Sequence, residues 1–165
     1  MFKSGIGQDS HRFEEDGSPK PLVIGGVHIP DCPGLLGNSD ADVVLHALTN
    51  AISGISGRNI LGKISDDMCL RQGITDSRAY LAQALESLGN YRISHVSIAI
   101  EGRRPRFEPI IAKMQESLAN LLALQPSDIG ITATTGEGLT AFGRGEGLQA
   151  FVIVSAECII KKHSR

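Results

Sequence analysis

Apolar and polar residues along the chain follow two different periods, one typical of helices and one typical of strands. In three segments apolar residues recur three and four positions apart, which predicts amphipathic helices. The second of these segments begins with an aspartate and ends at a glycine, both usual at helix ends. We therefore expect helices over residues 40–53, 76–89 and 107–124.

Strand signals lie between the predicted helices. The stretch PLVIGGVHIP reads as two short strands that meet at Gly25 and Gly26, which favours a hairpin. The last apolar stretch has almost no polar residues, as in a strand that is covered on both faces. Besides the hairpin, we expect strands over residues 92–101, 128–135 and 148–160. This order of elements predicts an α/β (α+β) fold with a single mixed β-sheet.

Length and composition predict a single domain over residues 1–165. The chain is 41% apolar and 21% charged, as in ordinary globular domains, with a net charge of −2. The low positive charge and the 4% aromatic content argue against a nucleic-acid partner. The three cysteines form no C-x-x-C pair, so a thiolate zinc site or a disulfide framework is not expected. Without a long apolar run, we expect a cytoplasmic protein with no membrane contact.

Candidate metal ligands lie in two short motifs. Asp9 and His11 are two residues apart, so in an extended segment both side chains project from one face. His46 lies among apolar residues of the first predicted helix, where it is either a satisfied core histidine or a third ligand. One carboxylate and two imidazoles make a three-ligand zinc site with an open fourth position, as in catalytic zinc.

The start of that helix also has a purely structural interpretation. Ser39 followed by Asp42 matches a helix-capping pattern, and acids in a first turn suit the helix dipole. On this interpretation Asp40 and Asp42 only begin the helix.

A glycine-rich loop follows the strand predicted at residues 128–135. Its backbone amides, together with the hydroxyls of Thr134 and Thr135, are suited to binding phosphate oxygens. Glu137 offers an oxygen to a magnesium ion on those phosphates. The alternative is simple turn chemistry. The segment GRRPRFEP lies near a strand end, where α/β proteins often bind ligands.

Taken together, the motifs resemble one family. The segments GQDSH, PLVIGGVHIP, GLLGNSDADVVLHALTNAISG, LGKISDD, TDSR, RRPRFEP and TATTGEGLTAFGRGEGL occur in the order and spacing of the 2-C-methyl-D-erythritol 2,4-cyclodiphosphate synthases. The resemblance covers nearly the whole chain. It implies a homotrimer with sheets facing the three-fold axis, helices outside and active sites between subunits.

The resemblance also implies a reaction of the non-mevalonate isoprenoid pathway. The substrate is 4-diphosphocytidyl-2-C-methyl-D-erythritol 2-phosphate, whose own 2-phosphate attacks the β-phosphorus and expels CMP. Zn²⁺ on Asp9, His11 and His46 and Mg²⁺ or Mn²⁺ on Glu137 are implied as cofactors. Thr135 and the residue at position 38 match positions assigned to the transition state.

The implied substrate contacts are spread along the chain. Residues 102–108 match the segment that binds cytosine, and the SDDMC stretch, read as a loop, matches part of the methylerythritol phosphate pocket. The full implied set is Asp9, His11, Asn38, Ser39, Ile60, Leu61, Gly62, Ser65, Asp67, Gly102, Pro105, Arg106, Glu108, Thr134, Thr135, Glu137 and Arg144.

Three positions depart from the family pattern. Asn38 replaces a usual histidine, and an amide donates hydrogen bonds but carries no charge. Ile60 stands where an aspartate binds sugar hydroxyls, and Ala141 replaces a phenylalanine near the axial cavity that holds isoprenoid diphosphates in the family. Two other functions therefore stay open: a zinc phosphoesterase with Asp40 or Asp42 as base, and a non-catalytic trimer that binds nucleotides or prenyl diphosphates.

Overall fold

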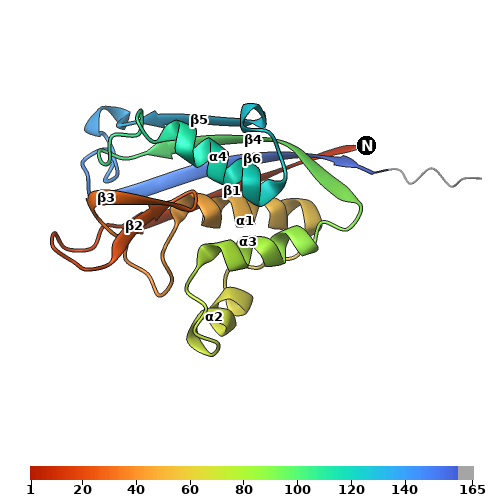
Figure 1. The fold of residues 1–165 in the computed structure, drawn as a ribbon, viewed down its shortest axis with the longest axis horizontal. Helices are drawn as coiled ribbons and strands as arrows, with labels where there is room; N and C mark the ends of the chain where they lie inside the picture. Colours follow the sequence, from red (N-terminus) through yellow and green to blue (C-terminus); the bar gives the residue numbers. More distant parts are fainter. Residues whose placement is uncertain (160–165) are drawn as a thin grey trace, which may run out of the picture.

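The computed structural model describes residues 1–159 and is built around a four-stranded mixed sheet (Figure 1). The strand order is β1-β6-β4-β5, in which β4 and β5 are parallel and the other neighbours antiparallel. Ile160, the last residue of the predicted final strand, lies outside the described residues. The bounds are β1 (Phe2–Arg12), β4 (Tyr91–Glu101), β5 (Ile129–Thr134) and β6 (Gly147–Cys158).

The predicted hairpin is a separate two-stranded sheet. Strands β2 (Pro21–Ile24) and β3 (Val27–Pro33) pair antiparallel around Gly25 and Gly26. Both glycines have positive φ, at 59° and 75°, a conformation that glycine adopts without strain. The sheet prediction was therefore incomplete, since a second small sheet accompanies the central one.

The three predicted helices are present with slightly different ends. They are α1 (Val43–Ser56), α3 (Ser77–Glu86) and α4 (Ile111–Leu122). A further helix, α2 (Lys63–Leu70), corrects the prediction of a loop there, and in Figure 1 it projects below α3. Ser65 is its only buried residue, and its apolar residues Ile64 and Met68 are only partly buried, so the apolar pattern is too short to predict a helix. Two short 3₁₀ turns, η1 (Pro126–Asp128) and η2 (Gly136–Gly138), flank β5.

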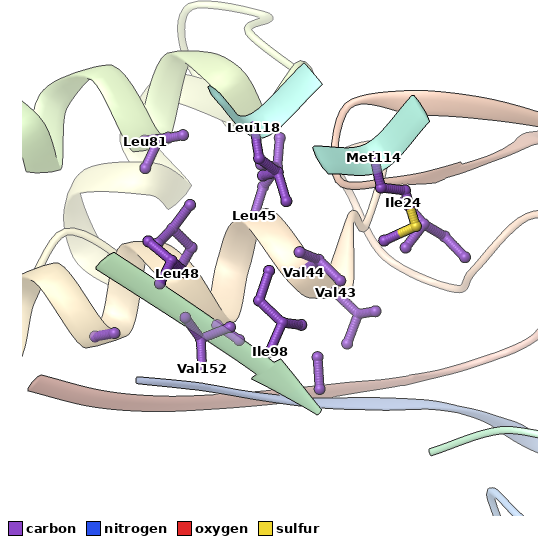
Figure 2. Packing of buried hydrophobic residues seen from close by; sticks show 14 of the residues in the cluster. Ile24, Val43, Val44, Leu45, Leu48, Leu81, Ile98, Met114, Leu118 and Val152 are labelled. Carbon is purple, nitrogen blue, oxygen red and sulfur yellow. The ribbon is translucent and has the colours of Figure 1, made fainter. Parts of the chain in front are cut away.

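The hydrophobic core lies between the sheet and the helices. Figure 2 shows α1 at its centre, with side chains of α3 and α4 on one side and those of β4 and β6 on the other. Residues of α1 are buried on nearly every side, which explains why the helix contains no Asp, Glu, Lys or Arg. Labelled members of this core include Val44, Leu45, Leu48, Leu81, Ile98, Met114, Leu118 and Val152.

The opposite face of the sheet is exposed in the single chain. Burial alternates along β6, and Phe151 and Ile153 are 44% and 47% exposed. Ile6, the partner of Ile153 on β1, is 67% exposed. The expectation that the last strand is covered on both faces is therefore wrong for the isolated chain. No helix within residues 1–159 is long and apolar enough to cross a bilayer.

Two glycines of β1 allow α1 to lie directly on that strand. A Cβ atom on Gly5 would stand 2.0 Å from the Ala51 carbonyl oxygen, and one on Gly7 would stand 2.0 Å from that of Ala47. Real Cβ contacts are never this short, so only glycine permits the approach. Gly5, Gly7 and Asp9 alternate on one face of β1. The approach therefore brings the first turn of α1 next to Asp9.

Candidate metal centre and nucleotide site

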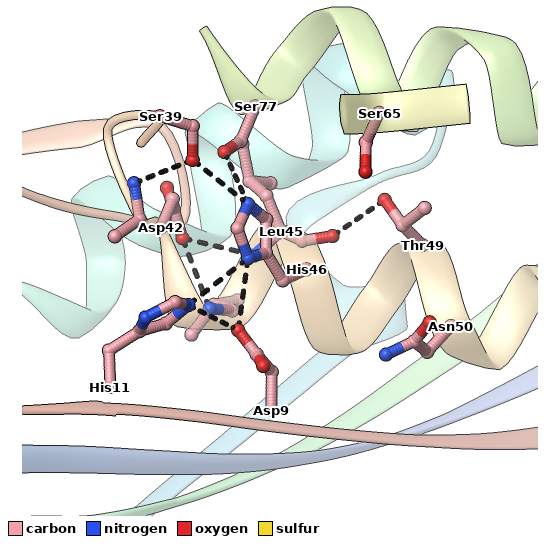
Figure 3. Close-up of polar contacts among 12 residues, drawn as sticks. Asp9, His11, Ser39, Asp42, Leu45, His46, Thr49, Asn50, Ser65 and Ser77 are labelled. Atoms are coloured by element: carbon pink, nitrogen blue, oxygen red, sulfur yellow. Dashed lines mark hydrogen bonds and ion pairs between the residues drawn. The ribbon is translucent and has the colours of Figure 1, made fainter. Parts of the chain in front are cut away.

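Asp9 and His11 extend from the face of β1 that α1 covers (Figure 3). His11 Nε2 lies 2.9 Å from Asp9 Oδ2. His46, on the first turn of α1 and 9% exposed, places Nδ1 3.0 Å from the same oxygen. His11 Nε2 and His46 Nδ1 are 3.3 Å apart. The three predicted ligands therefore converge, although 35 residues separate the two histidines in sequence.

The donor set fits a tetrahedral zinc ion. Ligand atoms at about 2.0–2.1 Å from zinc are roughly 3.4 Å apart in a tetrahedron. The three edges seen here, 2.9, 3.0 and 3.3 Å, come close to that spacing. Three protein ligands leave one position open to a substrate. The site is the one group of three or more candidate ligands among residues 1–159.

Charge within the triad favours an ionised carboxylate. Burial raises the pKa of Asp9, but hydrogen bonds with His11 and His46 outweigh it and lower that pKa to about 2. Burial lowers the pKa of His11, and its contact with Asp9 more than compensates, so the pKa is raised. Asp9 is therefore available as an anionic ligand at neutral pH.

Each histidine has a partner on the ring nitrogen that faces away from the triad. His11 Nδ1 lies 2.8 Å from the Leu36 carbonyl oxygen, to which it donates a hydrogen bond. His46 Nε2 lies 2.8 Å from Ser77 Oγ, and the Ser77 hydroxyl in turn donates to Asp40 Oδ1. Partners of this kind orient metal-binding imidazoles. The sequence analysis did not predict the contact of Ser77 with His46 or that of Asp40 with Ser77.

Asp42, rather than Ser39, is the N-cap residue of α1. Its carboxylate accepts hydrogen bonds from the backbone amides of Val44 and Leu45, at 3.1 and 3.0 Å. It also accepts from Gly25 and Gly26 in the hairpin turn, at 2.9 and 2.7 Å. The predicted Ser39–Asp42 capping pattern is thus wrong. Asp42 instead joins the helix start to the hairpin.

A pocket of about 260 Å³ lies beside the triad and contains part of the predicted substrate set. Ile60 is fully buried, and its side chain does not reach the pocket. Asp67 lines a different, larger cavity along α2, whereas its neighbour Asp66 lines this one. The pocket wall contains predicted residues, including those of the SDDMC stretch: His11, Asn38, Ser39, His46, Leu61, Ser65, Asp66 and Cys69. The sequence analysis missed Gly37 and Tyr80.

Gly62 is the N-cap of α2, and the other predicted residues lie at the end of β5 or in the segments that follow β4 and β5. Gly102 donates to the carbonyl of Thr134 at 3.0 Å, so the start of the 102–108 segment contacts the end of β5. The Thr134 hydroxyl accepts from the Gly136 amide at 3.0 Å. Glu137 is exposed and has a positive φ of 54°. Arg144 donates to the Leu139 carbonyl oxygen at 3.3 Å.

The two groups of residues are separated by the width of the sheet. Asp9 pairs with Ala150, Ala150 with Ile100, and Ile100 with Ala133. Neighbouring strands are about 4.8 Å apart, so Asp9 and Ala133 are separated by roughly 14 Å.

The two groups also lie on opposite faces. Thr134 pairs with Glu101, Glu101 with Gln149, and Gln149 with Ser10, so these four side chains share one face. Asp9, which precedes Ser10, points to the other face. One chain therefore does not bring the Thr134 side chain and the metal triad into one site.

Comparison with known proteins identifies the family. The model of the YgbB family matches residues 2–157. The chain belongs to the YgbB family. A relative from Chlamydia caviae is 47% identical over 156 residues, covers 94% of this chain and 89% of its own length, and is named 2-C-methyl-D-erythritol 2,4-cyclodiphosphate synthase. The resemblance inferred from the motifs is thereby confirmed, and the YgbB relatives named for this activity are enzymes.

Solved structures of this kind share the fold. The bifunctional IspDF of Campylobacter jejuni superposes with a TM-score of 0.86 at 30% identity, over 96% of this chain and 42% of that one. A 2C-methyl-D-erythritol-2,4-cyclodiphosphate synthase in a CDP-bound form superposes with a TM-score of 0.76 at 32% identity, over 94% of this chain and 100% of that one. The YgbB fold is thus shared with a protein that binds CDP.

Proposed function

We propose that this enzyme converts 4-diphosphocytidyl-2-C-methyl-D-erythritol 2-phosphate into 2-C-methyl-D-erythritol 2,4-cyclodiphosphate and CMP. An oxygen of the 2-phosphate forms a bond to the β-phosphorus, and the bond from that phosphorus to the CMP oxygen breaks. No protein nucleophile is needed, so the chain contributes positioning and charge stabilisation. The convergence of Asp9, His11 and His46 is the observation that carries this proposal.

The triad would hold Zn²⁺, which would act there as a Lewis acid on a phosphate oxygen of the substrate. The adjoining pocket, with Asn38, Ser39, Leu61 and Ser65 on its wall, is the place we assign to the methylerythritol phosphate. Asn38 lies exposed at the pocket and would donate its amide hydrogens to the reacting phosphates, in the role of a neutral donor.

We assign the cytidine diphosphate to the other group of residues. Thr134 and Thr135 would donate hydroxyl hydrogens to the diphosphate, with Thr135 beside the reacting phosphorus. Exposed Glu137 would hold Mg²⁺ or Mn²⁺, and residues 102–108, including Pro105, Arg106 and Glu108, would bind cytosine. The CDP-bound relative supports a cytidine nucleotide as part of the substrate.

The separation of these two groups supports a site made by two subunits. Because the triad and the Thr134 side chain lie on opposite faces of one sheet, a neighbouring chain has to complete the site. The exposed apolar face formed by Ile6, Phe151 and Ile153 offers the contact surface. We propose a homotrimer in which these faces surround the three-fold axis. The three free cysteines fit a reducing compartment, so we place the reaction in the cytoplasm.

The contacts weigh against the hydrolytic alternative. Asp42 is fully buried and accepts four backbone hydrogen bonds, and Asp40 is engaged by Ser77. Neither lines the pocket beside the triad. Both residues that were candidate general bases are therefore committed to structural contacts.

A product assay tests the proposal. Purified protein with Zn²⁺ and Mg²⁺ receives the diphosphocytidyl substrate, and ³¹P NMR follows the products. We expect CMP and a cyclic diphosphate from the wild type and from His28→Ala, an exposed histidine in the hairpin. His46→Ala should form neither. CMP with an open-chain bisphosphate would show that the protein is a hydrolase. If the zinc-loaded wild type releases no CMP, the proposed reaction is refuted and the non-catalytic binding protein is supported.

A further inference from the structure

A chain of polar contacts runs from His46 away from the triad and into the protein. His46 Nε2 lies 2.8 Å from Ser77 Oγ, while Ser39 Oγ, at 3.5 Å, is too distant for a strong hydrogen bond. Ser77 is the first residue of α3 and is fully buried. A buried hydroxyl at this distance from a ring nitrogen fixes the rotation of the ring.

Asp40 holds Ser77 through two contacts. The Ser77 hydroxyl donates to Asp40 Oδ1, and the Ser77 backbone amide donates to Asp40 Oδ2 at 3.1 Å. The Asp40 amide donates to the Thr75 carbonyl oxygen at 2.8 Å, which ties the loop before α1 to the loop before α3. The Ser77 hydroxyl has one proton, and Asp40 accepts it. Its oxygen is therefore left to accept a hydrogen bond from His46 Nε2–H.

We propose that Asp40 and Ser77 are positioning residues for His46, which they hold with the proton on Nε2 and the lone pair of Nδ1 directed at the metal. The inference rests on the proposed metal site. The sequence of contacts is Asp40 carboxylate, Ser77 hydroxyl, His46 imidazole, and then the ion. It differs from the usual carboxylate–histidine pair because a serine stands between the acid and the ring.

The arrangement holds the buried His46 ring from two sides. His46 faces the ionised Asp9 on one side and a hydroxyl that Asp40 polarises on the other. A ring held from both sides loses little further entropy when the ion binds, so metal affinity rises. Losing such an outer partner typically weakens metal binding 10–100-fold.

Metal binding measured by competition with a chromophoric chelator tests the role directly. We expect Ser77→Ala to weaken Zn²⁺ binding by about 10–100-fold. The matched control is Ser53→Ala, which removes another buried hydroxyl that bonds only to the Thr49 carbonyl of its own helix. Ser53→Ala should lose stability without losing zinc affinity. Ser77→Thr, which keeps a hydroxyl, should recover most of the affinity.

A spectroscopic measurement separates positioning from general destabilisation. In the zinc-loaded protein, ¹⁵N-resolved NMR should show a slowly exchanging proton on His46 Nε2, and this protection should disappear in Ser77→Ala. Wild-type affinity and protection in Ser77→Ala, or equal losses in Ser77→Ala and Ser53→Ala, would overturn the inference. A wild type that binds no zinc would overturn the metal site itself, together with this role. Loss of cyclisation with normal zinc binding would count only against the proposed reaction.

Discussion

Substitution of Gly7 by alanine tests whether the strand–helix approach builds the metal centre. The added Cβ would stand 2.0 Å from the Ala47 carbonyl oxygen and 2.4 Å from the Ala51 amide nitrogen. Ordinary contacts begin at 3.4 Å, so the first contact is too short by 1.4 Å. Both obstructing atoms belong to the backbone, so α1 as a whole has to move away from β1.

The movement should affect stability and metal binding together. Overpacking of this kind costs about 1–3 kcal/mol. His46 lies one residue before Ala47 and moves with it, whereas metal–ligand distances tolerate only about 0.2 Å. We therefore expect Gly7→Ala to weaken zinc binding at least about tenfold, as loss of ligand orientation does.

Urea unfolding and chelator competition measure the two effects. The control is Gly130→Ala in β5, where the added Cβ meets no atom closer than 3.8 Å. This variant should keep wild-type zinc affinity and nearly wild-type stability. Wild-type zinc affinity in Gly7→Ala, or equal losses in both variants, would refute the argument that the glycine places His46.

Four further predictions follow from particular contacts. Asp42→Ala should lower the free energy of unfolding by at least about 2 kcal/mol in urea melts, because buried backbone amides lose their acceptor. Asp76→Ala, which removes the N-cap of α3, should lower it by about 1 kcal/mol. Ile153→Glu should leave monomers in sedimentation velocity; an intact trimer would contradict the proposed interface. Zinc at a hundred times its Kd should raise the free energy of unfolding by about 2.7 kcal/mol. The measurement is the rise in Tm, which EDTA should reverse in the wild type and which should be absent in His46→Ala. In the metal-free protein, the ionised form of Asp9 should add about 2 kcal/mol to the free energy of unfolding above about pH 4, because its pKa is lowered to about 2 in the fold. This contribution should vanish as the pH falls towards 2, and Asp9→Asn should flatten that part of the plot of unfolding free energy against pH.

The sequence was most informative where local patterns and chemistry coincided. The i, i+2 spacing of Asp9 and His11 placed both on one strand face, and His46 stood out as a polar residue within an apolar helix. These three residues meet as predicted.

Contacts between elements that are distant in sequence were harder to predict. Ser77 reaches His46 only because α3 packs on α1, and Asp42 caps α1 while it also binds a hairpin turn 16 and 17 residues earlier. Helix α2 gave a weak apolar signal because its few apolar side chains are only partly buried against the core, and the helix also borders an open cavity. The apolar character of β6 indicated burial on both faces, but within a single chain only one face is covered.

The opposite orientation of the triad and Thr134 has a consequence for mixtures of defective chains. In the proposed trimer, a chain with His46→Ala would keep its proposed nucleotide residues and a chain with Thr135→Ala would keep its metal ligands. Each chain would therefore repair the other across the shared interface. Each site in the proposed ring would take one part from each of two neighbours. Equal and random mixing of the two inactive proteins would therefore restore about a quarter of the sites. Two alleles that each encode an inactive enzyme would then complement each other when expressed together.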